Sequence, residues 1–449
     1  MDKESITKLG LSTKSLDIDK SYEIYEESSS TNIIHLFFLP ETKKSCPMCH
    51  SNDFRIRGSK IISLKSASLL QYKMTVKLHL RVFKCNVCGR VFKEDNPYSY
   101  NSHTLSFNKY MLIIDALRNP TETFKSVATQ FGVSVTKVMN IFDTYVDINQ
   151  HDFPEVISFD EVYTRKFAKN KYCFILYSPM NSKIIDIVNS RHKLDLIQYF
   201  CETPMEYIKN VRYVSIDLYN NYRIIAKKVF FSPIICADPF HVIKNISQAF
   251  NAIRISVMNK YKDYKGENSH RYWLLKKFWK LILMDSSKLS YERFKIRKLD
   301  MWLSPKEIVF EILKTDPILE KAYDLLNDYR NFNSTYTYEE CEEKLDEFIH
   351  NFLSFPSEKY NTIGNMLKNW RQEIINSFIR YEGKRITNGF IERKNKDIKT
   401  IIRMANGYRN FARFRNRVMF SLNKNEPILA VPKKNTNKIK YKKRGKYKK

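Results

Sequence analysis

The sequence contains no apolar stretch long enough to cross a membrane. The best candidate, NIIHLFFL at residues 32–39, is far shorter than the roughly 20 residues that a spanning helix needs. The N-terminus also lacks the basic segment followed by an apolar one that marks a secretory signal. These absences predict a soluble cytoplasmic protein that has no membrane partner.

Acidic residues are scarce relative to basic ones. The 449 residues include 77 Lys and Arg but 48 Asp and Glu, which gives a formal net charge of +29. Because this charge far exceeds what solubility requires, it indicates a polyanionic partner. Nucleic acid is the first candidate for that partner. The length is too great for one hydrophobic core and predicts two to four folded units.

Cysteine is uncommon except in two closely spaced pairs. Four of the eight cysteines stand singly and are predicted to be buried thiols: Cys173, Cys201, Cys236 and Cys341. The other four form the motifs CPMC and CNVC, and two such motifs in an intracellular protein favour a structural Zn²⁺ site over disulfides or chance spacing. The expected zinc ligands are Cys46, Cys49, Cys85 and Cys88.

The segment between the two cysteine pairs has the alternation of a β-strand. In YKMTVKLHLRVFKC, five apolar residues are expected on one face: Met74, Val76, Leu78, Leu80 and Val82. The opposite face is basic and either contacts DNA or is simply solvated; it carries Lys73, Lys77, His79 and Arg81. The motifs and the strand together predict a zinc ribbon.

A helix-turn-helix pattern follows within residues 105–148. Ala128 allows two helices to approach, Gly132 makes the turn, and Val138 anchors the second helix. Similar patterns arise by chance in helical hairpins. If the pattern is genuine, the second helix would face a DNA major groove with Ser134, Thr136 and Lys137 at its start.

From residue 154 the pattern becomes that of an α/β sheet. Apolar strands and helices alternate in the order β-β-β-α-β-α-β-α, and the second and third strands form a hairpin with the turn at residues 179–181. Residues 256–380 carry all four Trp and helix-capping signals at Ser304–Glu307 and Thr337–Glu340, so we expect an all-helical insertion. A last core helix is predicted at residues 388–404.

Three acids stand where a carboxylate needs compensation. Asp160 and Asp217 lie in apolar runs, and Glu392 lies in a strongly basic segment. If the three come together, they can hold Mg²⁺, or Mn²⁺, beside a DNA phosphate. Ordinary roles remain open: Asp217 could cap a segment, Asp160 could pair with an Arg, and Glu392 could pair with Lys396.

Several motifs together resemble the bacterial insertion-sequence transposases of the ISL-three family. They are CPMC…CNVC, ISFDEVY, YVSIDLYNNY, ADPFHVIKNISQAF and NGFIERKNKDIKTIIRMANGYRNFARFRNR. The resemblance implies an RNase H-like core in which Asp160, Asp217 and Glu392 form a DDE triad. It implies a bacterial, nucleoid-associated transposase that binds double-stranded DNA at the terminal inverted repeats of its element and in the target. The resemblance also implies a homodimer that catalyses Mg²⁺-dependent cleavage and strand transfer. A derived DNA-binding regulator and a plain metal-dependent nuclease are the alternatives.

Other residues receive supporting roles. Asp238 and His241 in the motif ADPFH are secondary candidates for the active site, with a structural role that bonds strand to helix as the alternative. Glu161 is predicted to form a salt bridge on the opposite side of its strand. The aromatics Tyr408, Phe411 and Phe414 are expected in the core more than against DNA bases. Besides the three residues of the helix-turn-helix, the predicted DNA contacts are Arg393, Lys396, Lys399, Arg403, Arg409, Arg413 and Arg415.

The predicted fold is therefore a multidomain α+β protein. Its expected parts are a lead-in at residues 1–40, the zinc ribbon at 41–100, the helix-turn-helix at 101–150, the first part of the RNase H-like core at 151–255, the helical insertion at 256–380, the last core helices at 381–425, and a basic disordered tail at 426–449.

Overall fold

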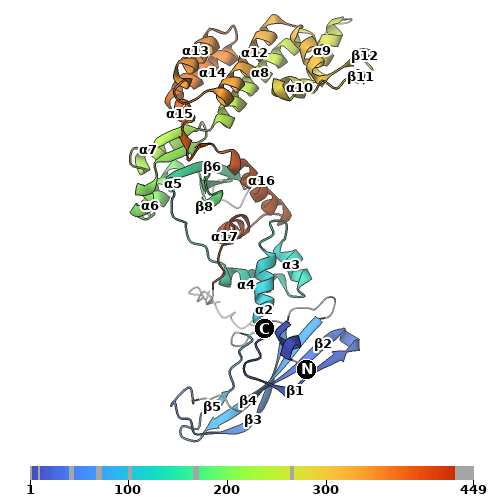
Figure 1. The fold of residues 1–449 in the computed structure, drawn as a ribbon, viewed down its shortest axis with the longest axis vertical. Helices are drawn as coiled ribbons and strands as arrows, with labels where there is room; N and C mark the ends of the chain where they lie inside the picture. The colour runs from blue at the N-terminus through green and yellow to red at the C-terminus, as the bar shows by residue number, and fades with distance from the viewer. Residues whose placement is uncertain are drawn as a thin grey trace, which may run out of the picture. The chain divides into compact units, whose positions relative to one another are not determined.

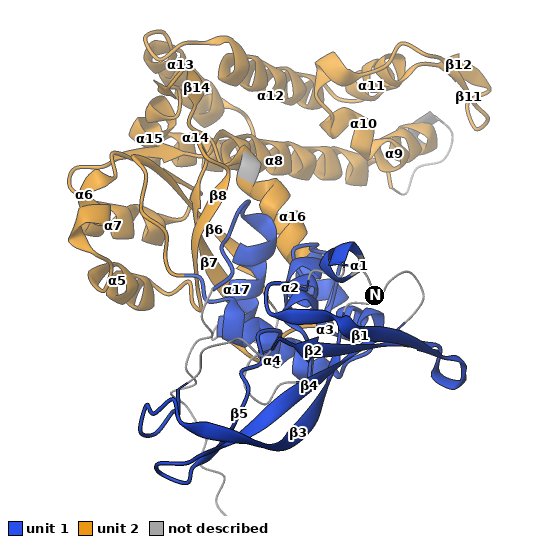
Figure 2. Ribbon diagram, turned by 60° about the horizontal axis from the view of Figure 1, so that its bottom comes forward, with its two compact units in different colours: residues 1–148, 400–406, 412–449 blue, residues 149–399, 407–411 orange. Residues whose placement is uncertain are grey.

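The chain folds into two compact units. The computed structural model describes residues 3–8, 11–39, 45–66, 73–99, 104–164, 171–262 and 267–429. Unit 1 comprises residues 1–148, 400–406 and 412–449, and unit 2 comprises residues 149–399 and 407–411 (Figure 2). In the parts of the chain just given, no helix is both long and apolar enough to cross a membrane.

Unit 1 begins with a helix, α1 (Lys3–Lys8), and a five-stranded sheet. The strands are β1 (Leu16–Glu26), β2 (Thr31–Phe38), β3 (Phe54–Lys65), β4 (Lys73–Cys85) and β5 (Val91–Lys93). Their order is β1-β2-β4-β3, with β5 paired to β4; β2 and β4 run parallel, and the other pairs are antiparallel. The prediction that residues 1–40 are a lead-in is wrong, because β1 and β2 belong to the same sheet as the cysteine motifs.

The predicted alternation along β4 holds for most of the strand. Met74, Val76, Leu78 and Leu80 are buried and form the core of this sheet with residues of β1, β2 and α1. Val82 breaks the alternation, since it is only half-buried while its neighbour Phe83 turns inward. The break coincides with a shift of register in the partner strand between Ile56 and Gly58.

Four helices complete unit 1: α2 (Phe107–Ala116), α3 (Phe124–Gln130), α4 (Val135–Tyr145) and α17 (Phe411–Leu422). The α3–α4 turn contains Gly132 in the left-handed region at φ +60°, which favours glycine. Ser134 caps α4 by accepting a hydrogen bond from the Lys137 amide. Ala128 and Val138 are buried between the helices, as the helix-turn-helix pattern predicts.

The prediction that the basic tail starts at residue 426 is wrong. Glu426 is buried and accepts a hydrogen bond from Asn423 Nδ2 at 2.9 Å, and the Leu429 backbone amide donates to the Tyr145 carbonyl at 2.9 Å. Residues 426–429 are therefore packed against unit 1. The rest of the predicted tail, residues 430–449, lies outside the described residues.

Unit 2 is built on a second five-stranded sheet. Its elements follow the chain as β6 (Val156–Tyr163), β7 (Tyr172–Ser178), β8 (Lys183–Val188), α5 (Lys193–Cys201), α6 (Met205–Asn210), β9 (Tyr213–Ile216), α7 (Asn220–Val229), β10 (Ile234–Ala237) and α8 (Pro239–Lys260). The strand order is β10-β9-β6-β7-β8, with β6, β9 and β10 parallel and the β6-β7-β8 meander antiparallel. The predicted order of elements is confirmed, with the short helix α6 added.

Helices lie on both faces of this sheet (Figure 1). On one face Phe159 packs against Phe200 of α5 and Tyr222 of α7, in a core that continues into the helical insertion. The helix α16 (Gly389–Met404) lies on the other side of the sheet.

Of the single cysteines, Cys173, Cys236 and Cys341 are buried as predicted, but Cys201 at the end of α5 is exposed.

The insertion is mostly helical but not entirely so. Its helices are α9 (Glu267–Lys277), α10 (Trp279–Leu283), α11 (Pro305–Leu313), α12 (Pro317–Thr335), α13 (Cys341–Ser354), α14 (Glu358–Asn369) and α15 (Arg371–Asn376). Two hairpins, β11–β12 (Phe294–Ile296, Met301–Leu303) and β13–β14 (Arg380–Tyr381, Lys384–Arg385), accompany them, so the expectation of an all-helical segment is wrong. The boundary expected at residues 255 and 256 falls inside α8.

The two predicted helix caps have different outcomes. Ser304 and Glu307 form the expected capping box at the start of α11. Glu340 accepts hydrogen bonds from the Thr337 amide and hydroxyl, but α13 starts only at Cys341. Thr337 therefore closes a turn that precedes the helix.

Candidate active site

Three aspartates line up across adjacent parallel strands of unit 2. Ser158 of β6 pairs with Ser215 of β9, and Ile216 of β9 pairs with Ala237 of β10. Extending this register places Asp160 beside Asp217 and Asp217 beside Asp238. Because parallel strands lie about 4.8 Å apart, the pairing brings three carboxylates together at the carboxyl ends of β9 and β10.

His241 lies against two of these carboxylates. It is one turn into α8, and its Nδ1 is 3.0 Å from Asp217 Oδ1 and 3.1 Å from Asp238 Oδ2. Asp217, Asp238 and His241 have ligand atoms within 4.8 Å of one another. Burial opposes the charged ring, but hydrogen bonds to the two carboxylates raise the pKa of His241 to about 10. The ring is therefore a cation that compensates Asp217 and the buried Asp238.

Asp160 is the most strongly perturbed acid of the site. Its side chain is buried, and burial together with the negative charge of Asp217 raises the pKa of Asp160 to about 7. One carboxylate oxygen accepts a hydrogen bond from the Glu161 amide at 2.6 Å. The other accepts one from Asn395 Nδ2 at 2.7 Å.

Two asparagines near the start of α16 hold the aspartates in place. Asn395 binds Asp160, and the Asn388 amide donates to Asp238 Oδ1 at 3.1 Å while its side chain reaches the Phe159 carbonyl at 3.3 Å. Neither asparagine was among the site residues predicted from the sequence. The available signal was the helical spacing, because residues 388, 392 and 395 fall on one side of a helix that carries the predicted catalytic glutamate.

Glu392 lies near this group but outside the tightest cluster. Its side chain is largely exposed, and partial burial followed by the charge of Asp238 raises its pKa. The other charges that act on it are His241, Lys244 and Asp217.

The residues at this site fit a divalent cation. Asp160, Asp217, Asp238 and Glu392 offer hard oxygen donors in a region where burial and like charges disfavour ionised carboxylates. Such a set of acids is stabilised by added positive charge, and His241 supplies part of it. The predicted triad is thus part of a larger set in which Asp238 and His241 are central.

Glu161 behaves as predicted. The Arg191 guanidinium donates to both of its carboxylate oxygens, at 2.7 and 3.0 Å, and Tyr222 lies 3.4 Å from one of them. These partners belong to the face of the sheet that carries α5 and α7. Glu161 therefore forms a salt bridge on the face of the sheet opposite to the one on which Asp160 lies.

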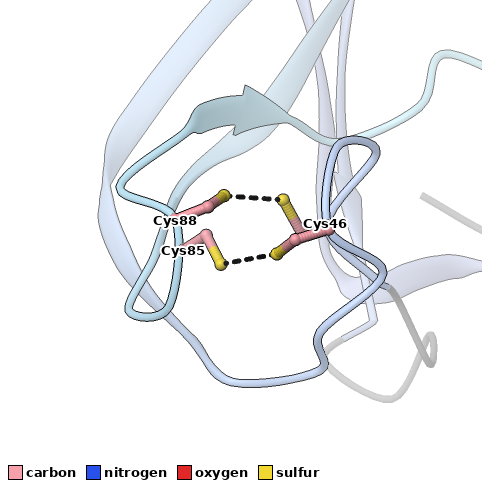
Figure 3. A group of neighbouring side chains, drawn as sticks. Cys46, Cys85 and Cys88 are labelled. Carbon is pink, nitrogen blue, oxygen red and sulfur yellow. Dashed lines mark hydrogen bonds between the residues drawn. The ribbon is translucent and has the colours of Figure 1, made fainter.

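The four paired cysteines form a second candidate metal site, in unit 1 (Figure 3). Two sulfur–sulfur distances are 3.5 Å (Cys46–Cys88) and 3.6 Å (Cys49–Cys85), and all four sulfurs lie within 4.8 Å of one another. Each pair lies in a tight turn, and the amides of His50 and Gly89 donate back to the first cysteine carbonyl of their turns. Four converging thiols suit tetrahedral Zn²⁺.

The predicted DNA contacts divide into exposed and internally bound residues. Arg413 pairs with Asp143 of α4, and Arg415 donates to the Ile148 carbonyl at 2.6 Å, so both hold α17 within unit 1. Lys137 is half-buried, with its ammonium 5.4 Å from the centre of the Tyr110 ring, and burial lowers its pKa. Phe414 is fully buried, as expected for the core. The remaining candidates are exposed: Ser134, Thr136, Arg393, Lys396, Lys399, Arg403 and Arg409.

Comparison with known proteins adds one finding. Residues 157–418, which include every residue of the candidate active site, match a family model described as a transposase. No curated protein matches the chain.

Proposed function

The chain belongs to the ISL3 family of transposases, and from this premise we propose that it cuts and joins DNA at the ends of its own mobile element. The reaction would be a metal-dependent phosphoryl transfer at the acids of unit 2, in a core of the RNase H-like type. The family implies DNA binding, and the net charge of +29 supports it.

One observation carries the proposal. The strand register places Asp160, Asp217 and Asp238 side by side, and the helix that bears Glu392 contributes Asn395 to the same group. Ordinary structural roles do not account for a row of carboxylates in which burial and then the charge of Asp217 raise the pKa of Asp160. A site that must bind cations next to phosphate does account for it.

The proposed roles follow from these positions. Asp160, Asp217 and Glu392 would hold Mg²⁺ or Mn²⁺, with Asp238 and His241 as additional ligands or as the groups that orient them. A cation bound there would polarise the phosphoryl oxygens and stabilise charge at the attacking and leaving oxygens. Asn395 would fix the carboxylate of Asp160, and Asn388 would fix that of Asp238.

The DNA would be held by exposed cations near the acids. Arg393, Lys396 and Lys399 project from α16 beside Glu392 and can bind phosphates. The exposed start of α4, with Ser134 and Thr136, is the proposed reader of the element's ends. We leave Arg413 and Arg415 out of this surface because their side chains bind within unit 1.

A cleavage assay tests the proposal. Purified protein would be incubated with labelled DNA from the flanks of its own gene, with and without Mg²⁺. Glu392→Gln and Asp217→Asn should nearly eliminate cleavage while the protein still binds the DNA, and combining them should cost little more than either alone. Appearance of a cut end joined to a target plasmid would distinguish transposition from simple nuclease activity.

Two matched substitutions serve as controls. Asp397→Asn removes a carboxylate from the same helix as Glu392, and Glu161→Gln removes the one next to Asp160 on the other face. Both proteins should cleave DNA at close to the unmodified rate. Cleavage at that rate by Glu392→Gln and Asp217→Asn would refute the assignment of the site.

A further inference from the structure

The sheet of unit 1 has a solvent-exposed face that the proposed chemistry does not use. Its inner face is closed by the core around Ile34, Leu36 and Leu78. On the outer face large side chains remain open to solvent: Tyr22 is 42% exposed and Ile61 is 53% exposed. Soluble proteins bury most side chains of this kind unless the surface has a partner.

Four aromatic rings form a continuous surface across β1, β2 and β4 on this face. Tyr22 pairs with His35 across β1 and β2, and their rings stack with centroids 4.5 Å apart. Phe37 pairs with His79 across β2 and β4, and their rings stack at 4.1 Å. His35 Nδ1 lies 2.9 Å from His79 Nε2, so a hydrogen bond joins the two stacked pairs.

The charge around these rings is positive. The strand alternation puts Lys65, Lys73 and Lys77 on the same face, because they alternate with the buried residues of β3 and β4. Two acids lie on this face within the paired stretches of β1: Asp17 pairs with Lys20 at 3.2 Å, whereas Glu26 accepts a hydrogen bond from the neutral Ser29 hydroxyl and keeps its charge.

A further cation on this face, Arg81, is already neutralised. Arg81 pairs with the buried Glu94 and donates to the Leu39 carbonyl at 2.8 Å. Among the described residues of β3 and β4, Lys65, Lys73 and Lys77 therefore give this face positive charge next to the aromatic rings.

We propose that this face binds DNA with unpaired bases, which stack on the rings of Tyr22, His35, Phe37 and His79 while Lys73 and Lys77 bind the phosphates. Aromatic rings next to lysines on an open sheet are the features that bind single strands, because every base offers a face for stacking. A duplex hides those faces. The inference goes beyond the proposed function because it needs neither the acids of unit 2 nor their metal.

A second copy of the chain is a less suitable occupant. A symmetric contact of this face with itself would bring the lysines of one copy close to those of the other. Like charges brought together in this way oppose association. A polyanion with exposed bases complements both the rings and the lysines.

The test measures binding of the full chain to a labelled single strand and to the matching duplex at raised salt, where general phosphate binding is weakened. Tyr22→Leu keeps bulk but removes the ring and should weaken single-strand binding about tenfold, with duplex binding changed less than about twofold. Tyr25→Leu is the matched control, since Tyr25 is on the same strand with similar exposure (48%) but on the opposite face. It should bind like the unmodified protein.

Lys77→Gln provides an independent test if Tyr22→Leu fails to fold. It should weaken single-strand binding and reduce the salt dependence of that binding. Equal effects of Tyr22→Leu and Tyr25→Leu, or unchanged binding by Lys77→Gln, would overturn the inference. The inference would also be overturned if sedimentation showed a dimer of the unmodified protein and a monomer of the Tyr22→Leu protein.

The inference and the proposed function can fail separately. Glu392→Gln should bind the single strand as well as the unmodified protein does, whatever happens to cleavage. Loss of single-strand binding in that protein would contradict the placement of this surface on unit 1.

Discussion

Asp160 depends on a side chain from a distant part of the sequence. Asn395 follows it by 235 residues and supplies the hydrogen bond to one of its two carboxylate oxygens. A buried carboxylate needs such donors to keep one orientation, and groups that orient a ligand affect the metal affinity of a site. Asn395 is therefore a positioning residue.

Replacing Asn395 by Ala should raise the Mg²⁺ concentration needed for half-maximal cleavage by roughly 10–100-fold. The rate at saturating Mg²⁺ should recover much of its value, because the acids themselves remain. Cleavage rates measured over a range of Mg²⁺ concentrations give both quantities. A lower rate with no change in the Mg²⁺ requirement would show that Asn395 acts only on the fold.

The raised pKa of Asp160 predicts a pH effect on stability without Mg²⁺. Between the ordinary pKa of 3.8 and the folded value of about 7, the folded protein binds more protons than the unfolded chain. The free energy of unfolding should therefore fall as the pH rises through this range. The Asp160→Asn protein does not undergo this loss of stability. Its melting temperature should therefore be higher than that of the unmodified protein at pH 7.5, and the two melting temperatures should be similar near pH 4.5. Thermal melts in magnesium-free buffer check this, and a lower melting temperature at pH 7.5 would contradict it.

At the scale of elements, the sequence predicted the sheet of unit 2 far better than that of unit 1. Strands β6 and β9 are mostly apolar and mostly buried, as expected for strands covered on both faces. β1 was missed because its sequence, LDIDKSYEIYE, is mostly polar and its burial comes from pairing with β2. The contacts of Asn395 and Asn388 were also missed, because they depend on distant strands.

The cysteine turns predict one Zn²⁺ per chain. Cys85→Ser should abolish zinc binding and lower the stability of the sheet, since Cys85 is also the last residue of β4 and thiolate binding contributes folding energy. Cys201→Ser is the control, because Cys201 is an exposed thiol far along the chain in α5. Metal analysis of both purified proteins decides the matter; equal zinc content would rule out the proposed ligands.

At the scale of the whole molecule, positive charge is spread over both units and the tail. The sequence KKNTNKIKYKKRGKYKK at residues 433–449 contains no acid. Contacts from such a segment to phosphate carry no sequence information. They add to the affinity for every DNA and to its dependence on salt.

Deleting residues 433–449 should therefore weaken binding to all DNA sequences by a similar factor and flatten the plot of log affinity against log salt concentration. Anisotropy titrations with element-end DNA and with unrelated DNA of equal length measure both effects. Selective loss of the preference for the element's ends would assign the tail a role in recognition.

The hydrogen bond between Asn388 and Asp238 has a consequence for synthesis of the protein. The two residues are 150 positions apart, and the whole helical insertion lies between them. A ribosome therefore releases the strands that carry Asp160, Asp217 and Asp238 long before it makes the helix that carries Glu392 and Asn395. Nascent or prematurely terminated chains lack the last acid and both orienting asparagines. We expect the element to be protected from cutting by incomplete copies of its own enzyme.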